Sequence, residues 1–499
     1  MSLAIVHSRG LVGVDAPAVT VEVHIGNGLP AFHIVGRPET EVRESRERVR
    51  AALLHAGFDF PNRRLTVNLA PADLPKGSGR FDLPIAAGIL AASGQIPAAE
   101  LDGLELIGEL SLDGTLRPVR GALAMTLAMS RDSRPRTLLL PRANGAEASL
   151  AGGLRLLAAD TLRDVAAHLL GASPLERIDG AAPPIVAAAH GELADVKGHA
   201  GAKRALEVAA AGAHNLLMVG PPGAGKSLLA QRLPSILPPL SPQQALEAAA
   251  IAGLGGRFSP AQWGHRPFRS PHHSASMAAV IGGGAQPRPG EASLAHHGTL
   301  FLDELPEFSR GVLEGLREPL ETGRVNLARA ARHIDFPARF QLIAAMNPCP
   351  CGHFGSSRCR CSPEQLRRYQ ARLSGPLLDR IDLLINVQPV DEAELLGGPP
   401  SEPSAAVAAR VERAHHRQYE RQAALNAHLE PRAVDEHCRL EPNAAALLRE
   451  AARRRQWSSR ALHRVVKLSR TIADLGEADA IVAAHVAEAI SYRHALQID

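Results

Sequence analysis

The sequence predicts an α/β protein in three parts: an α/β unit, a second α/β unit with a parallel sheet, and a helical C-terminal region. Three observations predict this order. Residues 19–25 alternate between apolar and polar side chains, as a half-buried strand does. Residues 193–396 alternate between helical and strand patterns, which is typical of a parallel sheet. From Ser404 onward, apolar residues recur at helical spacing and strand patterns disappear.

The composition is that of a globular protein whose cores consist mainly of Ala, Leu, Val and Ile. Of the 499 residues, 45% are hydrophobic, 21% are charged and 3% are aromatic. The net charge of +4 permits a polyanionic partner without requiring one. The sequence has neither a signal-peptide pattern nor an apolar run of about 18 residues. We therefore expect a cytoplasmic protein that does not enter a membrane.

The first unit is predicted to span residues 1–172. Val42, Val49 and Leu53 fall on one face of a predicted helix. Asp113-Gly114 separates two short alternating arms, which predicts a hairpin. Further strands are predicted at residues 65–69, 138–140 and 154–157. A linker rich in Ala, Pro and Gly is predicted at 173–192, the second unit at 193–396 and the helical region at 397–499.

The second unit contains a predicted phosphate-binding loop. An apolar strand at 215–219 leads into GPPGAGKS, and a helical pattern follows. Glycines let backbone N–H groups face phosphate oxygens, Lys226 would reach the β- and γ-phosphates, and Ser227 would ligate Mg²⁺. The sequence therefore predicts bound ATP and Mg²⁺, held by Gly220, Pro221, Pro222, Gly223, Ala224, Gly225, Lys226 and Ser227.

Polar side chains end two further predicted strands. Asp303 and Glu304 follow the apolar residues 299–302. Asp303 would lie near the metal, and Glu304 would be the base that activates the attacking water. Asn347 follows another predicted strand, at the edge where ligands bind in open α/β sheets. It would help to place the water beside the γ-phosphate.

Four of the five cysteines lie in one insertion, residues 347–361. They form two C-x-C pairs, which supply a four-thiolate shell for a structural Zn²⁺. His353 is an alternative ligand, and free or redox-active thiols are the alternative interpretation. The four cysteines are Cys349, Cys351, Cys359 and Cys361.

Several motifs resemble those of one family. GPPGAGKS, TLFLDELPEF, AAMNPCPCG and GPLLDRIDL, in this order, resemble the magnesium-chelatase-like branch of AAA+ ATPases. FRSPHHSAS, PRPGEASLAHHG and NPCPCGHFGSSRCRC resemble the ComM/YifB group within that branch. The resemblance implies an AAA+ domain followed by a helical lid, and a homohexameric ring. It also implies that Arg380 is an arginine finger acting on a neighbouring subunit, and that Arg460 contacts nucleotide from the subunit's own lid.

The first unit resembles the proteolytic domain of Lon proteases through PKGSGRFDLPIAAGILAASG and GELSLDGTLRPVRGALA. When these segments are aligned, Arg80 and Leu123 occupy the positions of the catalytic Ser and Lys. The resemblance therefore implies a Lon-protease-like α/β domain without proteolytic activity. Lys76 to Arg80 would form an exposed basic loop, which is more typical of a solvated turn than of a recruitment or DNA-contact surface.

Residues 321–339 have strand-like arms and resemble the hairpin that enters the ring pore in AAA+ DNA motors. Arg329 and Arg332, near its tip, would grip DNA phosphates. A second insertion contains a His pair that lacks an acidic partner at helical spacing, which favours a pore or interface loop over a metal site. Its basic residues are Arg269, His272, His273 and Arg288.

Two functions of different class fit these features. The first, which the resemblance to the ComM/YifB group implies, is a motor that remodels branched or duplex DNA without sequence specificity, as a branch-migration helicase in recombination of transforming DNA. The second is the motor subunit of a chelatase that inserts Mg²⁺ into a porphyrin. The Lon-like unit and the C-x-C pairs favour the DNA motor, and the missing Lys opposes a Lon-type protease. The low aromatic content predicts contact with the DNA backbone rather than base stacking.

Overall fold

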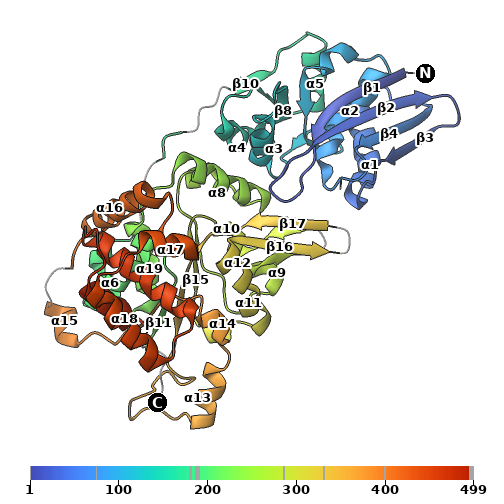
Figure 1. Cartoon of the computed structure of the whole chain (residues 1–499). Helices are drawn as coiled ribbons and strands as arrows, with labels where there is room; N and C mark the ends of the chain where they lie inside the picture. The colour runs from blue at the N-terminus through green and yellow to red at the C-terminus, as the bar shows by residue number, and fades with distance from the viewer. Residues whose placement is uncertain are drawn as a thin grey trace.

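The computed structural model describes residues 2–74, 76–178, 183–185, 191–284, 287–329, 332–397 and 401–493. Over these residues the chain forms an N-terminal α/β part, a second α/β part with a parallel sheet, and a C-terminal group of helices (Figure 1). This is the fold class that the sequence predicts. Within the described ranges, no helix combines the length and the apolar character that a membrane span requires.

The N-terminal part is built on a mixed sheet with the strand order β10-β9-β8-β5-β1-β2-β4-β3. The strands predicted at 19–25, 65–69 and 138–140 are confirmed, whereas the strand predicted at 154–157 begins later, at Leu156. Part of the segment predicted as a linker forms a strand instead: β10 pairs antiparallel with β9. The strands are β1 (Ser2–Arg9), β2 (Ala18–Gly26), β3 (Ala31–Val35), β4 (Arg64–Ala70), β5 (Leu104–Leu106), β8 (Thr137–Pro141), β9 (Leu156–Ala159) and β10 (Glu176–Ile178).

Helices α1 (Thr40–His55) and α2 (Asp82–Ala92) cover this sheet, and α2 packs against both β1 and β2. Val42, Val49 and Leu53 of α1 are buried, as predicted. The predicted hairpin at Asp113-Gly114 is confirmed by the pair β6 (Glu109–Leu110) and β7 (Leu116–Arg117). The remaining helices of this part are α3 (Ala122–Met129), α4 (Gly145–Ala148) and α5 (Leu162–Leu169).

The expected exposed basic loop at Lys76 to Arg80 is wrong, because both of these cations are buried. Lys76 is 0% exposed and Arg80 is 6% exposed. The backbone carbonyl of Lys76 accepts a hydrogen bond from the N–H of Glu39, and its ammonium group donates to the carbonyl of Pro71. The loop is therefore tied to the segment that enters α1 and does not project into solvent.

The second part contains a sheet of five parallel strands in the order β12-β15-β18-β11-β19. The strands β11, β15 and β18 are buried throughout, because helices cover both faces. The strands are β11 (Leu216–Val219), β12 (Phe268–Arg269), β15 (Thr299–Leu302), β18 (Gln341–Met346) and β19 (Leu383–Asn386). The helices include α6 (Ala200–Gly212), α7 (Lys226–Arg232), α8 (Pro242–Leu254), α9 (Met277–Val280), α10 (Glu291–Leu294), α11 (Arg310–Gly315) and α12 (Arg317–Thr322).

The predicted hairpin at 321–339 is present as β16 (Arg324–Arg329) and β17 (Arg332–Pro337), which pair antiparallel (Figure 1). The side chains of Arg329 and Arg332 lie outside the described residues. The base of the hairpin packs against the N-terminal part, because Ile334 and Phe336 share one apolar cluster with Ala124 of α3. A second short hairpin consists of β13 (Gly282–Gly283) and β14 (Arg288–Pro289).

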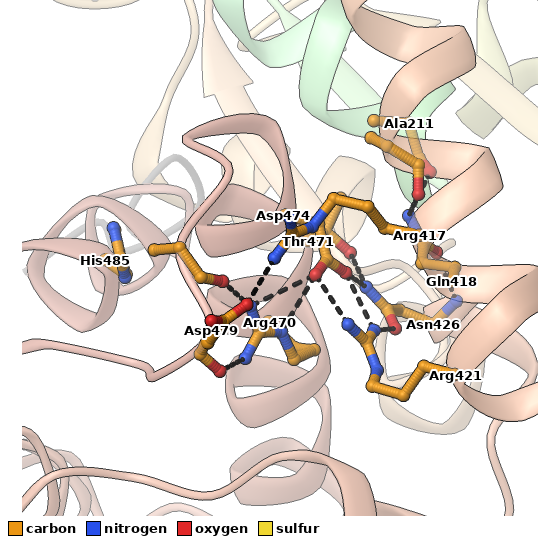
Figure 2. A network of polar contacts seen from close by, with 12 residues as sticks. Ala211, Arg417, Gln418, Arg421, Asn426, Arg470, Thr471, Asp474, Asp479 and His485 are labelled. Atoms are coloured by element: carbon orange, nitrogen blue, oxygen red, sulfur yellow. Dashed lines mark hydrogen bonds and ion pairs between the residues drawn. The ribbon is translucent and has the colours of Figure 1, made fainter.

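Buried polar contacts join the C-terminal helices to one another (Figure 2). Asp474, 1% exposed, accepts hydrogen bonds from Arg421 at 2.7 and 2.9 Å and from Asn426 at 2.8 Å. A buried carboxylate is tolerated when it is paired in this way, so the network ties α16 to α19. Oγ1 of Thr471, also in α19, lies 2.7 Å from Nε2 of His214 beside β11. Helices α13 (Pro363–Gln370) and α14 (Gly375–Leu378) lie between β18 and β19 and belong to the second part. The helices after β19 are α15 (Glu392–Gly397), α16 (Ser404–Gln422), α17 (Pro431–His437), α18 (Pro442–Arg455), α19 (Ser459–Leu475) and α20 (Ala483–Ser491).

Candidate functional site

The carboxyl ends of the parallel strands bring the predicted nucleotide-site residues together. The GPPGAGKS loop follows β11, Asp303 and Glu304 follow β15, and Asn347 follows β18. These residues line one cavity of about 380 Å³. The sequence-based expectation that the three segments meet at one edge therefore agrees with their positions.

The backbone of the loop depends on glycine at three positions. Gly223 and Gly225 have φ angles of 78° and 80°, in the left-handed region that favours glycine. A Cβ atom at Gly220 would lie 2.1 Å from the carbonyl oxygen of Val387, so a side chain there has no room. The loop curls close to the sheet edge as a result and leaves its outer side open to a ligand.

Lys226 lies at the centre of this cavity and is only 8% exposed. Its Nζ donates to the carbonyl oxygens of Gly220 at 2.7 Å and Pro221 at 2.8 Å, and to Oδ1 of Asn347 at 3.2 Å. Burial lowers the pKa of its ammonium group. Among the described residues no carboxylate forms an ion pair with Lys226, so its charge is available to phosphate oxygens.

Two oxygen ligands of the kind that Mg²⁺ prefers lie beside Lys226. Oγ of Ser227 donates to Oδ2 of Asp303 at 2.5 Å, which places a hydroxyl group and a carboxylate together at the loop. The backbone N–H of Glu304 donates to Oδ1 of Asp303 at 2.9 Å. Glu304 has a φ angle of 52°, in the left-handed region that few residues other than glycine adopt.

The Glu304 carboxylate has a partner that sequence reasoning missed. Nδ1 of His273 lies 3.0 Å from Oε2 of Glu304. The sequence offers no acidic partner of the His pair at helical spacing. Glu304 was not considered because it follows a strand that is distant in the sequence. His199 was also missed, and its Nε2 would lie 3.2 Å from a Cβ atom at Gly225. No local pattern in the sequence marks either histidine as part of this site.

Arg380 and Arg460 lie together, at a different place from the P-loop. The guanidinium group of Arg380 pairs with the carboxylate of Glu321, and Arg460 lies 3.7 Å from the same carboxylate. Both arginines line a separate cavity of about 590 Å³, with Asp382 and Arg464 in its wall. Glu321 was not predicted from the sequence.

The position of Arg460 corrects one expectation from the sequence. We expected Arg460 to contact the nucleotide of its own chain. Arg464, one turn later in α19, pairs at 2.6 Å with Asp382, which precedes β19. This contact anchors the start of α19 at the amino edge of the sheet, whereas the P-loop lies at the carboxyl edge. Arg460 therefore does not reach the P-loop of its own chain in this structure.

The four clustered cysteines have the geometry of a metal shell. Their sulfur atoms all lie within 4.8 Å of one another, with Cys349 to Cys351 at 3.4 Å and Cys351 to Cys359 at 3.8 Å. A tetrahedral Zn²⁺ with bonds of about 2.3 Å requires sulfur separations of about 3.8 Å. Hydrogen bonds from the backbone N–H groups of Arg360 and His353 lower the pKa of Cys351 to about 6, whereas burial raises the pKa of Cys349. Metal binding would therefore have to displace the proton of Cys349. The donor set therefore fits Zn²⁺.

The cysteine loop also contacts the nucleotide site. A Cβ atom at Gly352 would lie 2.5 Å from Cδ of Pro222, so the loop packs directly on the P-loop. His353 is not part of the group of four sulfur ligands. A bound metal would consequently brace one wall of the cavity that contains Lys226.

A second group of side chains has the spacing of metal ligands but is already hydrogen-bonded. Glu247 accepts from His297 at 2.6 Å and lies 3.5 Å from Nε2 of His296. Nδ1 of His296 accepts a hydrogen bond from the backbone N–H of Arg339 at 3.0 Å. Its proton is therefore on Nε2, the nitrogen that faces Glu247, which makes it a donor rather than a ligand.

Three family profiles match the chain. "Magnesium chelatase, subunit ChlI" matches residues 192–395, "Magnesium chelatase, subunit ChlI C-terminal" matches 401–493, and "Subunit ChlI of Mg-chelatase" matches 21–144. The chain is 51% identical to protein YifB of Salmonella typhimurium, over 99% of this chain and 97% of that protein. It is 48% identical to the competence protein ComM of Haemophilus influenzae, over 99% and 98%. An uncharacterised protein of Mycobacterium tuberculosis, Rv2897c, is 41% identical over 99% of each chain.

Proposed function

The chain belongs to the ComM/YifB group of magnesium-chelatase-like AAA+ ATPases, and from that premise we propose that it is a ring-forming motor that remodels DNA. The observation that carries the motor chemistry is the contact of Ser227 with Asp303 beside the buried Lys226. The finer activity that we propose is that of a branch-migration helicase acting in the recombination of transforming DNA.

ATP cleavage follows from the positions of five side chains. Lys226 would exchange its contacts with carbonyl oxygens for the β- and γ-phosphates of ATP. Ser227 and Asp303 would hold Mg²⁺, which neutralises the charge that develops on the phosphoryl group. Glu304 would take the proton of the attacking water, and Asn347 would orient that water. His273 holds the Glu304 carboxylate at 3.0 Å, so this contact has to open before Glu304 faces the water.

A ring explains why both predicted arginines lie away from the P-loop. A subunit that lacks a cation for the transferring phosphoryl group can receive one from its neighbour in a head-to-tail ring. We propose that Arg380 and Arg460 both act on the ATP of the adjacent subunit, and that Glu321 holds them until that ATP arrives. The ring would be a homohexamer.

Two features support DNA as the substrate. One of the relatives that match almost the whole chain is a competence protein, by its name. The β16–β17 hairpin carries Arg329 and Arg332 near its tip, where phosphate contacts would be independent of sequence. The structural Zn²⁺ proposed for the four cysteines would stiffen the P-loop wall during the cycle.

The alternative function is the motor subunit of a magnesium-chelatase-like complex. The family descriptions that match this chain name that subunit, and one of them covers residues 21–144. A chelatase motor would hydrolyse ATP through the same residues but would not respond to DNA. The response to DNA therefore discriminates between the two functions.

The deciding experiment is ATP-dependent dissociation of a labelled four-way DNA junction. Wild type should dissociate the junction, whereas Lys226→Ala should not, and a linear duplex serves as the substrate control. A double variant, Arg329→Ala with Arg332→Ala, should lose dissociation, while Arg142→Ala, an exposed arginine of the N-terminal part, should retain it. An intact junction together with ATP hydrolysis that is indifferent to DNA would reject the DNA motor and favour the chelatase function.

A further inference from the structure

A cavity of about 490 Å³ lies between the N-terminal part and the second part of the chain. One side is formed by the loop at residues 77–80 and by Val119 of the N-terminal part. The other side is formed by Leu254 of α8, Arg288 of β14 and Phe336 of β17. The cavity shares no lining residue with the nucleotide cavity, and its volume is within the range of about 300–1,000 Å³ usual for small-molecule sites.

Arg80 is the buried cation of this cavity. The residue is 6% exposed and lines the wall. Its Nε donates to Oγ of Ser78 at 2.8 Å, and Nη1 lies 3.8 Å from the sulfur of Met125. Within the part of the chain that the structure describes, no carboxylate forms an ion pair with Arg80. Burial accordingly lowers the pKa of its guanidinium group to about 10.

Three carboxylates also line the wall, those of Glu39, Glu41 and Glu109. Among the described residues, neither Glu41 nor Glu109 forms an ion pair with Arg80. Arg48 forms an ion pair with Asp82 at 2.7 Å, and Glu109 forms an ion pair with Arg117 at 3.8 Å. Glu41 lies near enough to raise the pKa of Arg80 but forms no ion pair with it. Two further arginines of the wall, Arg120 and Arg288, are exposed.

An uncompensated buried charge is costly, and buried arginines in proteins are normally paired. The planar guanidinium group presents parallel N–H donors that match the two oxygens of a carboxylate or phosphate. Nε of Arg80 donates to Ser78 and Nη1 donates to the sulfur of Met125, so Nη2 and the second N–H of Nη1 are the donors left for a ligand. Part of the wall is apolar, through Leu11, Leu254 and Phe336.

We propose that this cavity binds a small ligand through a carboxylate or phosphate group, which accepts hydrogen bonds from the terminal nitrogens of Arg80. The apolar wall covers the rest of the ligand. Because the walls come from both parts of the chain, a bound ligand fastens the base of the β16–β17 hairpin to the N-terminal part. The site is separate from the nucleotide edge and does not depend on the proposed DNA activity.

The test uses full-length Lys226→Ala as the parent, so that the P-loop does not compete for phosphate. Phenyl phosphate and benzoate are titrated separately by calorimetry, with neutral benzamide as the control ligand. We expect one of the two anions, or both, to bind at one site per chain and to raise the thermal midpoint, since a ligand that binds the folded state stabilises it. Binding of phenyl phosphate alone would assign a phosphate ligand, and binding of benzoate alone a carboxylate ligand.

Arg80→Gln should weaken this binding by about tenfold or more, because it removes a charge-assisted pair of hydrogen bonds. Arg142→Gln, which removes an exposed arginine of the same part, should leave the affinity unchanged. The proposal is overturned if neither anion binds better than benzamide, or if Arg80→Gln binds like its parent. Should Arg80→Gln fail to fold, Glu41→Gln decides, since removal of this exposed carboxylate should tighten anion binding, and an unchanged affinity overturns the proposal.

Discussion

The guanidinium group of Arg380 is paired with the carboxylate of Glu321, and that carboxylate also lies 3.7 Å from Arg460. Neither arginine lines the P-loop cavity. Arg380→Ala should therefore leave ATP binding intact and remove ATP turnover, because the missing cation acts only on the neighbouring phosphoryl group. Fluorescent-nucleotide binding and phosphate release measure the two effects. Arg368→Ala removes an exposed arginine on α13 and is the matched control, which should change neither ATP binding nor ATP turnover.

Subunit mixing tests whether Arg380 acts between chains. Arg380→Ala and Glu304→Gln should each be inactive alone. In a mixed ring, the ATP site of an Arg380→Ala subunit keeps its own Glu304. That site can receive the intact Arg380 of a neighbouring Glu304→Gln subunit. Random mixing in equal amounts would then complete about a quarter of the interfaces and restore turnover accordingly. Mixtures that remain inactive, although the rings assemble, would contradict action between chains.

Lys226 is held by three oxygen acceptors and forms no ion pair within the described residues, so its charge is reserved for phosphate. Lys226→Ala should lower ATP turnover by at least about a hundredfold, as expected when a donor to the transferring group is lost. Steady-state phosphate release measures the loss, and the thermal midpoint checks that the variant is folded. A folded variant that retains most of the turnover would remove Lys226 from the phosphate site.

The nucleotide edge was predictable because its residues obey two local rules. The GPPGAGKS spacing follows a strand, and Asp303 and Asn347 end strands of the same parallel sheet. Parallel strands bring their carboxyl ends to one edge, so sequence order alone places these groups together. The hairpin at Asp113-Gly114 and the buried face of α1 were predictable for the same reason, since turn chemistry and helical period are local.

The partners of these groups were not predictable, because tertiary packing sets them. Nothing near Glu304 in the sequence indicates His273, and nothing near Arg380 indicates Glu321. Lys76 and Arg80 lie in a segment that reads as an exposed turn, yet other parts of the fold cover it. The position of Arg460 depends on the anchor between Arg464 and Asp382, which joins two distant segments.

The sulfur separations in the cysteine loop predict about one zinc ion per chain in the purified protein, measured by plasma mass spectrometry. Cys349→Ser should lower the metal content and the thermal midpoint, because Cys349 is the buried member of the shell. Cys438→Ser is the matched control, since this buried cysteine lies outside the cluster. Its metal content should equal that of wild type.

Removal of the metal should also weaken ATP binding at the nucleotide site. Gly352 packs on Pro222, so a loosened cysteine loop would disturb the P-loop wall. With Mg²⁺ in excess, we expect a zinc-selective chelator to weaken ATP binding by wild type and to leave ATP binding by Cys349→Ser unaffected. Unchanged metal content in Cys349→Ser would exclude the cysteine cluster as the metal site.

Glu147 in α4 predicts a pH dependence of stability at the contact between the two α/β parts. Its side chain is buried against α8, where a Cβ atom at Gly253 would lie 2.1 Å from Oε1, and it accepts a hydrogen bond from the N–H of Leu123 at 3.2 Å. Burial raises its pKa from 4.5 to about 7. Between these two values the folded state binds more protons than the unfolded state, so the free energy of unfolding falls as the pH rises.

Glu147→Gln stays uncharged at every pH and keeps an acceptor for the Leu123 N–H. Relative to wild type, it should raise the free energy of unfolding at pH 8.5 by up to about 3 kcal/mol and have little effect at pH 5. Thermal or denaturant unfolding at both pH values measures this difference, with Glu100→Gln as the exposed control. A Glu147→Gln effect of the same size at both pH values would show that the carboxylate does not titrate on unfolding, and that the contact with α8 is purely steric.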